Sequence, residues 1–539
     1  MAPSKLRLSS RVPFVRALRL SWSLPTEALL ESAATELWKW PEYVHLEGAG
    51  PSAGGLESVV WPKQLKHLVL DSGLKTAMEA VRWPDSLIRL QLLGKFNEPI
   101  AGVEWPSCLQ HLEFGDDFDQ DITGVVLPAS LKRLFLGKWF NQPIVGVVWP
   151  ASVEQIEFRW YFNQPIAGVV WPASLQQLSF GVHFRQPIMD VVWPDSLLQL
   201  TLGVYFNHPI TGVVWPVSLQ RLWIRGCFDQ PVIDVSWPNS LRQVEFIRSD
   251  FNQPIVGVVW PTSLEKLAFS DRFNQPIVGV AWPDSLQHLS LGDYFDQPVT
   301  GVTWPPSLQQ LEFGSHFNQP IVGVAWPASL QDLSLGGGFD QPVAGVAWPP
   351  SLQKLSFANK FKQPIAGVVW PASLQQISFG DDFNQPITGV TWPPSLQQLE
   401  FGYGFNQPIA GVAWPASLQD LSLGGGFDQP VAGVAWPPSL QKLSFGNKFK
   451  QPIAGVVWPA SLQQISFGDD FNQPVAGVAW PPSLRKLSFG HRFNQPIVGV
   501  GWPASLQQLS FGDDFKQPIA GIVWPASLKC VTRGGCRLL

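Results

Sequence analysis

The sequence has little charge and no cluster of basic residues. Only 14% of its 539 residues are charged, the net charge is −5, and lysine and arginine are scattered along the chain. The chain therefore has no cluster of cations that could neutralise a phosphate backbone, and we expect no nucleic-acid partner. Proline, glycine or polar residues interrupt every apolar run within about a dozen positions, which is too short to span a bilayer. We expect no membrane partner either.

Cysteine is scarce as well. The four cysteines are Cys108, Cys227, Cys530 and Cys536. Their spacing matches no zinc site and no disulfide framework, so we predict a reducing, cytoplasmic setting. The acid-free, arginine-rich first 25 residues also fit an organelle presequence. The alternative is a strand in the first coil, because Val15, Leu18 and Leu20 repeat a spacing found throughout the chain.

Aromatic composition indicates that one unit has been copied many times. There are 27 Trp and 35 Phe but only 5 Tyr, a skew that unrelated domains would average away. The phenylalanine that opens F-N-Q-P-I recurs every 22 residues, with one extra residue in the stretch FIRSDF before Phe251. With Trp as position 1, the repeat is W-P-x-S-L-x-x-L-x-F-G-x-x-F-N-Q-P-I-x-G-V-x. Such a fixed period is typical of a solenoid.

The repeat divides the chain into three parts. Residues 1–60 are predicted to form an N-terminal cap with a degenerate repeat and a short helix over 26–38. Residues 61–523 hold 21 tandem repeats in one solenoid, and 524–539 hold a truncated last repeat and a tail. Arg533 replaces a core phenylalanine in that last repeat. We therefore expect the last coil to fray or to be capped by the tail.

Each repeat contains two strand-like patterns, L-x-x-L-x-F and I-x-x-V-x-W, as in Leu396 to Phe401 and Ile387 to Trp392. Alternation bounded by Pro and Gly favours short, half-buried strands, and two prolines per repeat exclude a useful helix. The fold class is therefore all-β. The sequence predicts a right-handed parallel β-solenoid of about 22 coils, with two short strands in each coil.

Repetition itself argues against catalysis. A serine at position 4 and a glutamine at position 16 recur in nearly every repeat, so we expect them to bond to turn backbone. The acid pair in GDDF is replaced by GGGF or GNKF in other repeats, and position 13 alternates in charge from Lys448 to Asp514. The histidines form no triad or metal spacing, and no nucleotide-binding glycine motif occurs. We predict no catalytic, cofactor-binding or metal-binding residue, and therefore no enzyme.

The motif also resembles a known family. F-N-Q-P-I, as in Phe140 to Ile144, followed by P-x-S-L-x-x-L-x-F-G, is similar to the FNIP repeat, a relative of leucine-rich repeats. The resemblance covers residues 61–530. It departs in having Trp-Pro where that family has Leu-Pro or Ile-Pro, and only Leu127 keeps the leucine. The resemblance implies a leucine-rich-repeat-like solenoid that takes part in protein–protein interaction.

Function must then lie in the variable, exposed positions of the repeat. Between about residues 127 and 236 these positions become aromatic. The candidate partner-binding residues are Phe135, Trp139, Trp160, Tyr161, His183, Tyr205 and Trp223. Exposed Trp and Tyr on a rigid scaffold suit a protein interface. The alternative is that the older repeats drifted while the later ones were copied recently.

Three functions agree with this pattern. The first is a monomeric, non-catalytic scaffold that binds a protein partner through the aromatic positions. The second is a solenoid that recognises a carbohydrate or another ligand by stacking on the same aromatics. The third is a structural spacer that has no specific ligand.

Overall fold

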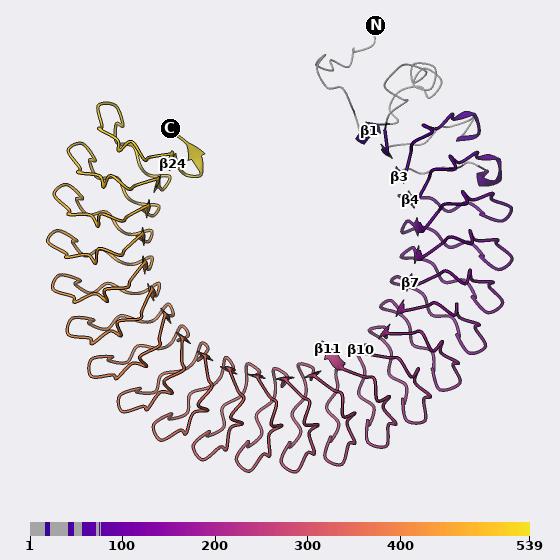
Figure 1. Ribbon diagram of the computed structural model, residues 1–539, viewed down its shortest axis with the longest axis horizontal. Coiled ribbons are helices and arrows are strands. Elements are labelled where there is room, and N and C mark those ends of the chain that lie inside the picture. Colours follow the sequence, from indigo (N-terminus) through magenta and orange to yellow (C-terminus); the bar gives the residue numbers. More distant parts are fainter. Residues whose placement is uncertain (1–16, 22–40, 48–55, 72–74, 76, 539) are drawn as a thin grey trace, which may run out of the picture. The chain divides into compact units, whose positions relative to one another are not determined.

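The computed structural model describes residues 17–21, 41–47, 56–71, 75 and 77–538. The chain forms two compact units. The first comprises Met1–Gln253 and Val258–Leu264, and the second comprises Pro254–Gly257 and Glu265–Leu539. Within each unit the chain winds into stacked coils that each contribute one short strand (Figure 1). The helix predicted over 26–38 lies outside the described residues.

The strands of the first unit pair in parallel, each with the strand of the next coil. They are β1 (Ala17–Ser21), β2 (Tyr43–Glu47), β3 (His67–Asp71), β4 (Arg89–Leu93), β5 (His111–Phe114), β6 (Arg133–Leu136), β7 (Gln155–Phe158), β8 (Gln177–Ser179), β9 (Gln199–Thr201), β10 (Arg221–Arg225) and β11 (Gln243–Ile247). Equivalent residues pair, for example Leu112 with Leu134. Two 3-10 turns, Leu56–Ser58 and Met78–Ala80, are the helical elements among the described residues.

The second unit repeats this arrangement. Its strands are β12 (Lys266–Ala268), β13 (His288–Ser290), β14 (Gln310–Phe313), β15 (Asp332–Leu335), β16 (Lys354–Ser356), β17 (Gln376–Ser378), β18 (Gln398–Phe401), β19 (Asp420–Leu423), β20 (Lys442–Phe445), β21 (Gln464–Ser466), β22 (Lys486–Ser488), β23 (Gln508–Phe511), β24 (Cys530–Arg533) and β25 (Cys536–Arg537). All pair in parallel except β25, which runs antiparallel to β24. The predicted parallel β-solenoid is confirmed.

The core consists of columns of identical side chains. Phe118, Phe140 and Phe162 are fully buried, and their rings stack from coil to coil at 6.1 Å between centroids. The repeat tryptophans form a second column, as in Trp149 and Trp171, whose rings are 6.3 Å apart. Each large aromatic removes about 150–250 Å² from water. Every coil therefore covers the apolar face of the coil before it.

The prediction of two strands per coil is wrong. The I-x-x-V-x-W segment forms a turn in which the Val390 amide donates to the Ile387 carbonyl at 3.3 Å. Gly389 stands in the left-handed region with φ of 80°, and a chain bent in this way cannot continue as a strand. This segment therefore closes the coil through local bonds, and among the described repeats the strand of each coil is formed by the L-x-x-L-x-F segment.

Two side-chain ladders join the coils at their turns. The Ser130 hydroxyl donates to the Leu109 carbonyl of the preceding coil at 2.7 Å, and other repeat serines do the same. The Gln164 amide donates to the Asn141 carbonyl at 2.8 Å. Both ladders bond to turn backbone as predicted. A third ladder was not predicted: the side-chain oxygen of Asn141 accepts from the Asn163 backbone amide at 2.9 Å.

The first coil, the last coil and the extra residue before Phe251 each depart from the regular repeat without interrupting the stack within their unit. Strand β1 pairs with β2, which confirms the expected strand in the first coil. The last coil is capped, because β25 folds back on β24 and the Leu538 amide donates to the Val531 carbonyl at 2.7 Å. At the extra residue, Arg248 takes φ of 46° and the buried Ser249 hydroxyl accepts from the Phe251 amide. The repeat resumes with Phe251 in the core.

Candidate functional site

The predicted aromatic column lies in the turn that follows the strand of each coil. A main-chain ladder fixes this turn. The Tyr161 amide donates to the Lys138 carbonyl at 2.9 Å, and the His183 amide donates to the Trp160 carbonyl at 2.8 Å. Because each turn is bonded to the turn before it, residues at position 13 project side by side from consecutive coils.

Three rings of this column stack face to face. The centroids of Trp139 and Tyr161 are 4.0 Å apart with 7° between their planes, and those of Tyr161 and His183 are 4.5 Å apart with 17°. Tyr205 follows at 5.0 Å, tilted by 58°. Trp139 and Tyr205 are each 46% exposed. Both faces of Tyr161 are therefore covered, whereas Trp139 and Tyr205 stand at the ends of the column and each have a ring on one side only.

Trp160 lies beside this column, one position earlier in its repeat. Its side chain is 47% exposed. The Lys138 ammonium lies 5.4 Å from the Trp160 ring centroid and 5.8 Å from that of Trp139. Cation–π attraction of this kind contributes about 0.5–1 kcal/mol at exposed sites. Lys138 thus connects Trp160 to the column and adds a positive charge to it.

Phe135 and Trp223 occupy a different place, the solvent-facing side of the sheet. Phe135 on β6 pairs in register with Glu113 and Glu157 of the adjacent strands. Arg159 reaches past it to Glu113, with 2.5 Å between Nη2 and Oε1, and also lies 3.7 Å from Glu157. This ion-pair network surrounds the half-buried ring.

Trp223 stands on β10 between Arg221 and Arg225, and all three face away from the core. In register it pairs with Thr201 of β9 and Glu245 of β11. The seven predicted residues therefore form no single patch. Five of them gather at the turns, and Phe135 and Trp223 lie on the sheet four strands apart.

A shallow pocket of about 480 Å³ opens between these two groups. Its floor includes the small residues Ser179 and Gly181, and the larger side chains of Arg159 and Trp160 on one side and Arg225 on the other rise around them. It is lined by Asp116, Lys138, Glu157, Phe158, Arg159, Trp160, Ser179, Phe180, Gly181, Val182, Val204 and Arg225. Sequence reasoning missed its three cations, because it searched for aromatic residues alone.

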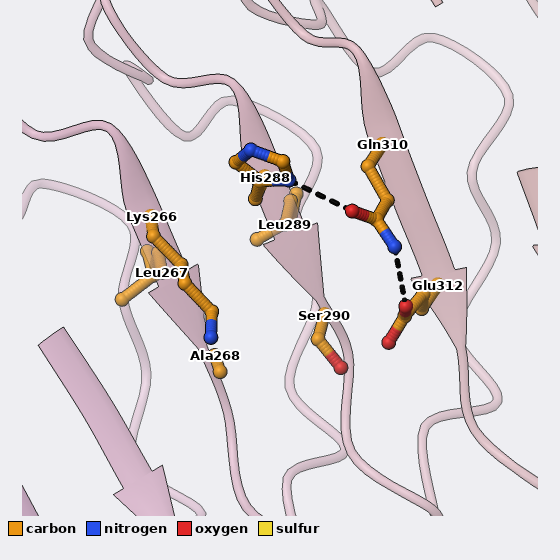
Figure 2. A pocket seen from close by; sticks show the side chains of 8 residues that line it. All are labelled: Lys266, Leu267, Ala268, His288, Leu289, Ser290, Gln310 and Glu312. Carbon is orange, nitrogen blue, oxygen red and sulfur yellow. Dashed lines mark hydrogen bonds between the residues drawn. The ribbon is translucent and has the colours of Figure 1, made fainter. Parts of the chain in front are cut away.

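A comparable pocket of about 360 Å³ lies over β12, β13 and β14, again above small residues, Ala268 and Ser290. Figure 2 shows a chain of hydrogen bonds along one side of it. His288 Nδ1 donates to Gln310 Oε1 and Gln310 Nε2 donates to Glu312 Oε1, both at 2.8 Å. Figure 2 also shows the Ser290 hydroxyl pointing away from the imidazole. Serine and histidine therefore do not form a nucleophile pair.

Titratable groups on the sheet face respond to burial and to neighbouring charge. Burial, followed by repulsion from Arg89 and Arg133, lowers the pKa of His111 to about 4. His111 is therefore neutral between two guanidinium groups at neutral pH. In the second unit, burial raises the pKa of Asp332. The nearby Lys354 lowers this pKa in part, and Glu312 raises it further.

Aromatic residues are fewer at the equivalent turns of the second unit. Tyr294 stacks on His316 at 4.4 Å between centroids, and Tyr403 lies under the Lys448 ammonium. Sequence reasoning also missed these residues. The predicted alternation of charge is present, since Arg492 and Asp470 form an ion pair at 2.8 Å.

Two further observations concern the described residues only. No group of three or more His, Cys, Asp or Glu side chains among them could hold a metal ion. None of their helices is long and apolar enough to cross a membrane.

Comparisons with known proteins agree on the repeat. The FNIP Repeat family matches residues 96–138, 140–183, 162–205, 251–294, 273–316, 295–338, 361–404, 383–426, 405–448, 427–470, 449–492 and 493–532. The crystal structure of CroV588, described as a novel circular LRR protein, is similar at 32% identity and a TM-score of 0.67, over 96% of this chain and 92% of that one.

A more distant structure shares the fold alone. A chain of the Toll–Spatzle complex of Drosophila is 12% identical, with a TM-score of 0.52, over 77% of this chain and 67% of that one. No curated protein matches the chain by sequence.

Proposed function

The chain belongs to the FNIP repeat family, and we propose that it is a non-catalytic scaffold that binds a protein partner through one surface of its first unit. This surface, the turn patch, consists of Trp139, Trp160, Tyr161, His183 and Tyr205. A single observation carries the proposal: three large aromatics of this patch are each close to half exposed, at turns where the fold accepts Gly, Asp or Lys elsewhere.

The geometry of the patch favours a protein over a carbohydrate. A sugar ring stacks on the open face of an aromatic ring, but the faces of Tyr161 are covered by Trp139 and His183. Ring edges and the Lys138 ammonium remain accessible, and these groups suit the mixed apolar and polar contacts of a protein interface. Stacking also holds the rings in place, so binding orders few rotamers and costs little entropy.

The test is affinity capture from a native lysate with the full chain as bait. The variant carries Trp139→Ala, Tyr161→Ala and Tyr205→Ala. A matched control carries Tyr294→Ala, His316→Ala and Tyr403→Ala, which removes aromatics of similar exposure from turns of the second unit. Far-UV circular dichroism of both variants should match the wild type, because these positions tolerate small residues in other repeats.

We expect a partner that the wild type and the control retain and the turn-patch variant loses. Truncating a central Trp or Tyr of an interface commonly costs about 2 kcal/mol or more, so three such changes should abolish capture. Identical captures from all three proteins would leave sequence drift as the explanation of the aromatic residues.

A further inference from the structure

From β4 to β10, the sheet face of the first unit carries an excess of positive charge, although the whole chain is negative. Solvent-facing positions of β4 to β10 and of the residue after each strand hold five arginines and two glutamates, a net +3. These are Arg89, Arg133, Arg159, Arg221, Arg225, Glu113 and Glu157. The same positions of β12 to β23 hold four lysines and four acids, which cancel: Lys266, Lys354, Lys442, Lys486, Glu312, Asp332, Glu400 and Asp420.

The charge of this face is not neutralised within the chain. Arg159 is engaged by Glu113 and Glu157. The side chain of Arg225, by contrast, is exposed and makes no hydrogen bond or ion pair among the described residues. An exposed guanidinium with all its donors available is preorganised to bind a carboxylate in the two-bonded geometry.

Arg225 also lines the pocket that borders the turn patch. Lys138 and Arg159 supply two further cations there, against the acids Asp116 and Glu157. Trp160, Val182 and Val204 supply apolar wall. A side chain that combines an apolar stem with a terminal negative charge matches this lining.

We propose that the pocket receives an aspartate or glutamate side chain of the protein partner, and that the partner segment bound there is acidic. This proposal rests on the proposed function, because the same partner would contact the turn patch through Trp160. The carboxylate binds Arg225 while the stem packs on Trp160 and the valines. Glu113 and Glu157 stand among the arginines and would repel a continuous phosphate backbone, whereas separate carboxylates can pair with separate cations.

The experiment uses the full chain and three fluorescein-labelled peptides of sixteen residues. All three contain two phenylalanines at the same places, and they differ in having glutamate, glutamine or lysine at the same eight positions. Oligothymidylate of sixteen nucleotides is the fourth probe. Fluorescence anisotropy compares the wild type with Arg225→Gln, with the turn-patch variant, and with Arg185→Gln as the matched control. Arg185 is also an exposed arginine of the first unit, but it lies outside the sheet and the pocket.

We expect the glutamate peptide to bind at least tenfold more tightly than the glutamine peptide, and the lysine peptide to bind least. Arg225→Gln should weaken the glutamate peptide at least fivefold, and Arg185→Gln less than twofold. Raising the salt concentration should weaken the glutamate peptide selectively. Equal binding of the glutamate and glutamine peptides, equal effects of the two arginine variants, or no binding of the glutamate peptide would overturn the proposal.

Two outcomes separate this proposal from the proposed function. If the turn-patch variant weakens all three peptides while Arg225→Gln changes none, the interaction surface stands and the acidic partner is rejected. If oligothymidylate binds as tightly as the glutamate peptide and is lost with Arg225→Gln, the surface binds phosphate and the acidic polypeptide is rejected.

Discussion

The unpredicted ladder of Asn and Asp side chains allows a quantitative test of how the coils are held together. Asn163 Oδ1 accepts from the Arg185 backbone amide at 2.9 Å and from Gln186 Nε2 at 3.1 Å. Replacing Asn163 with alanine removes both bonds. Gln186 keeps its second acceptor, the Asn163 carbonyl, at 2.9 Å. The amide of residue 185 is therefore the group that loses its protein partner.

The size of the effect follows from these contacts. A neutral hydrogen bond contributes about 0.5–1.5 kcal/mol net, and the exposed Arg185 amide can bond to water once its partner is removed. Because Gln186 retains one bond, we expect Asn163→Ala to lower the local opening free energy by about 0.5–1.5 kcal/mol. At about 1.4 kcal/mol per tenfold, this difference corresponds to roughly 2-fold to 12-fold faster exchange of the Arg185 amide.

Hydrogen–deuterium exchange with mass spectrometry measures this effect, because the repeats of the first unit are distinct in sequence and their peptides can be assigned. Arg185 itself provides the converse change. It stands where most repeats have Asn or Asp, so no side-chain oxygen at position 15 faces the Asn207 amide of the next coil. Arg185→Asn should therefore slow exchange at Asn207 about threefold to fivefold, for a gain of about 0.5–1 kcal/mol.

The ladder would not contribute to stability if exchange at Arg185 changed less than twofold in Asn163→Ala. Uniformly faster exchange across the whole first unit would also contradict this role of the ladder, because it would mean that the substitution had distorted the coil. A control substitution, Pro165→Ala, changes an exposed residue of the same turn and should leave the Arg185 amide unaffected.

Two further substitutions test other parts of the first unit. His111 has a folded-state pKa of about 4, below its unfolded value of about 6.5, so the unfolded chain binds the proton first and stability is lost as the pH falls from about 6.5 toward 4. Relative to His111→Gln, the wild type should lose about 1 kcal/mol of unfolding free energy between pH 7 and pH 5, allowing for partial solvent screening. Urea unfolding measures this difference, and an equal difference between the two proteins at both pH values would contradict the expectation. Asp234 takes φ of 62° where most repeats have glycine, so Asp234→Gly should stabilise its coil by about 1 kcal/mol, seen as slower exchange there, and no change would show that the strain is relieved elsewhere.

Much of the fold could be predicted because the repeat presents the same constraints in every coil. Leu134 and Ile156 occupy the same position of successive repeats, so parallel pairing in register follows once the period is known. The second strand could not be excluded from the pattern alone. Ile387 and Val390 have the spacing of a strand, but left-handed Gly389 between them allows a turn that local bonds complete. Hydrophobic spacing reports which residues are buried, and it does not report where their amides donate.

For the candidate site, the sequence predicts one column of residues but not the pocket beside it. Trp139, Tyr161 and His183 could be placed in one column from their common repeat position, and their stacking follows from the distance between coils. Phe135 and Trp223 share an aromatic character with that column but point from a different face, the sheet. The pocket could not be predicted from any one repeat, because it depends on a difference between coils: Trp160 and Arg225 are bulky departures from the repeat, and Gly181 between them keeps the usual small residue.

In such a solenoid, residues that are identical in successive coils build the core, and residues that differ between coils create the candidate binding sites. A position filled by the same residue in every coil gives a uniform column, as the buried phenylalanines do. A change in size or charge over one or two coils creates an exposed ring or an unpaired cation without disturbing the core, as Trp160 and Arg225 do, and a hollow remains where the coil between them keeps the usual glycine, Gly181. Recognition should therefore concentrate where the repeats diverge most, and the four-repeat blocks 304–391 and 392–479, which are nearly identical, should contribute mainly length. Deleting residues 392–479 removes whole repeats and should leave peptide binding to the first unit unchanged within twofold. A larger loss would place the binding surface in the second unit.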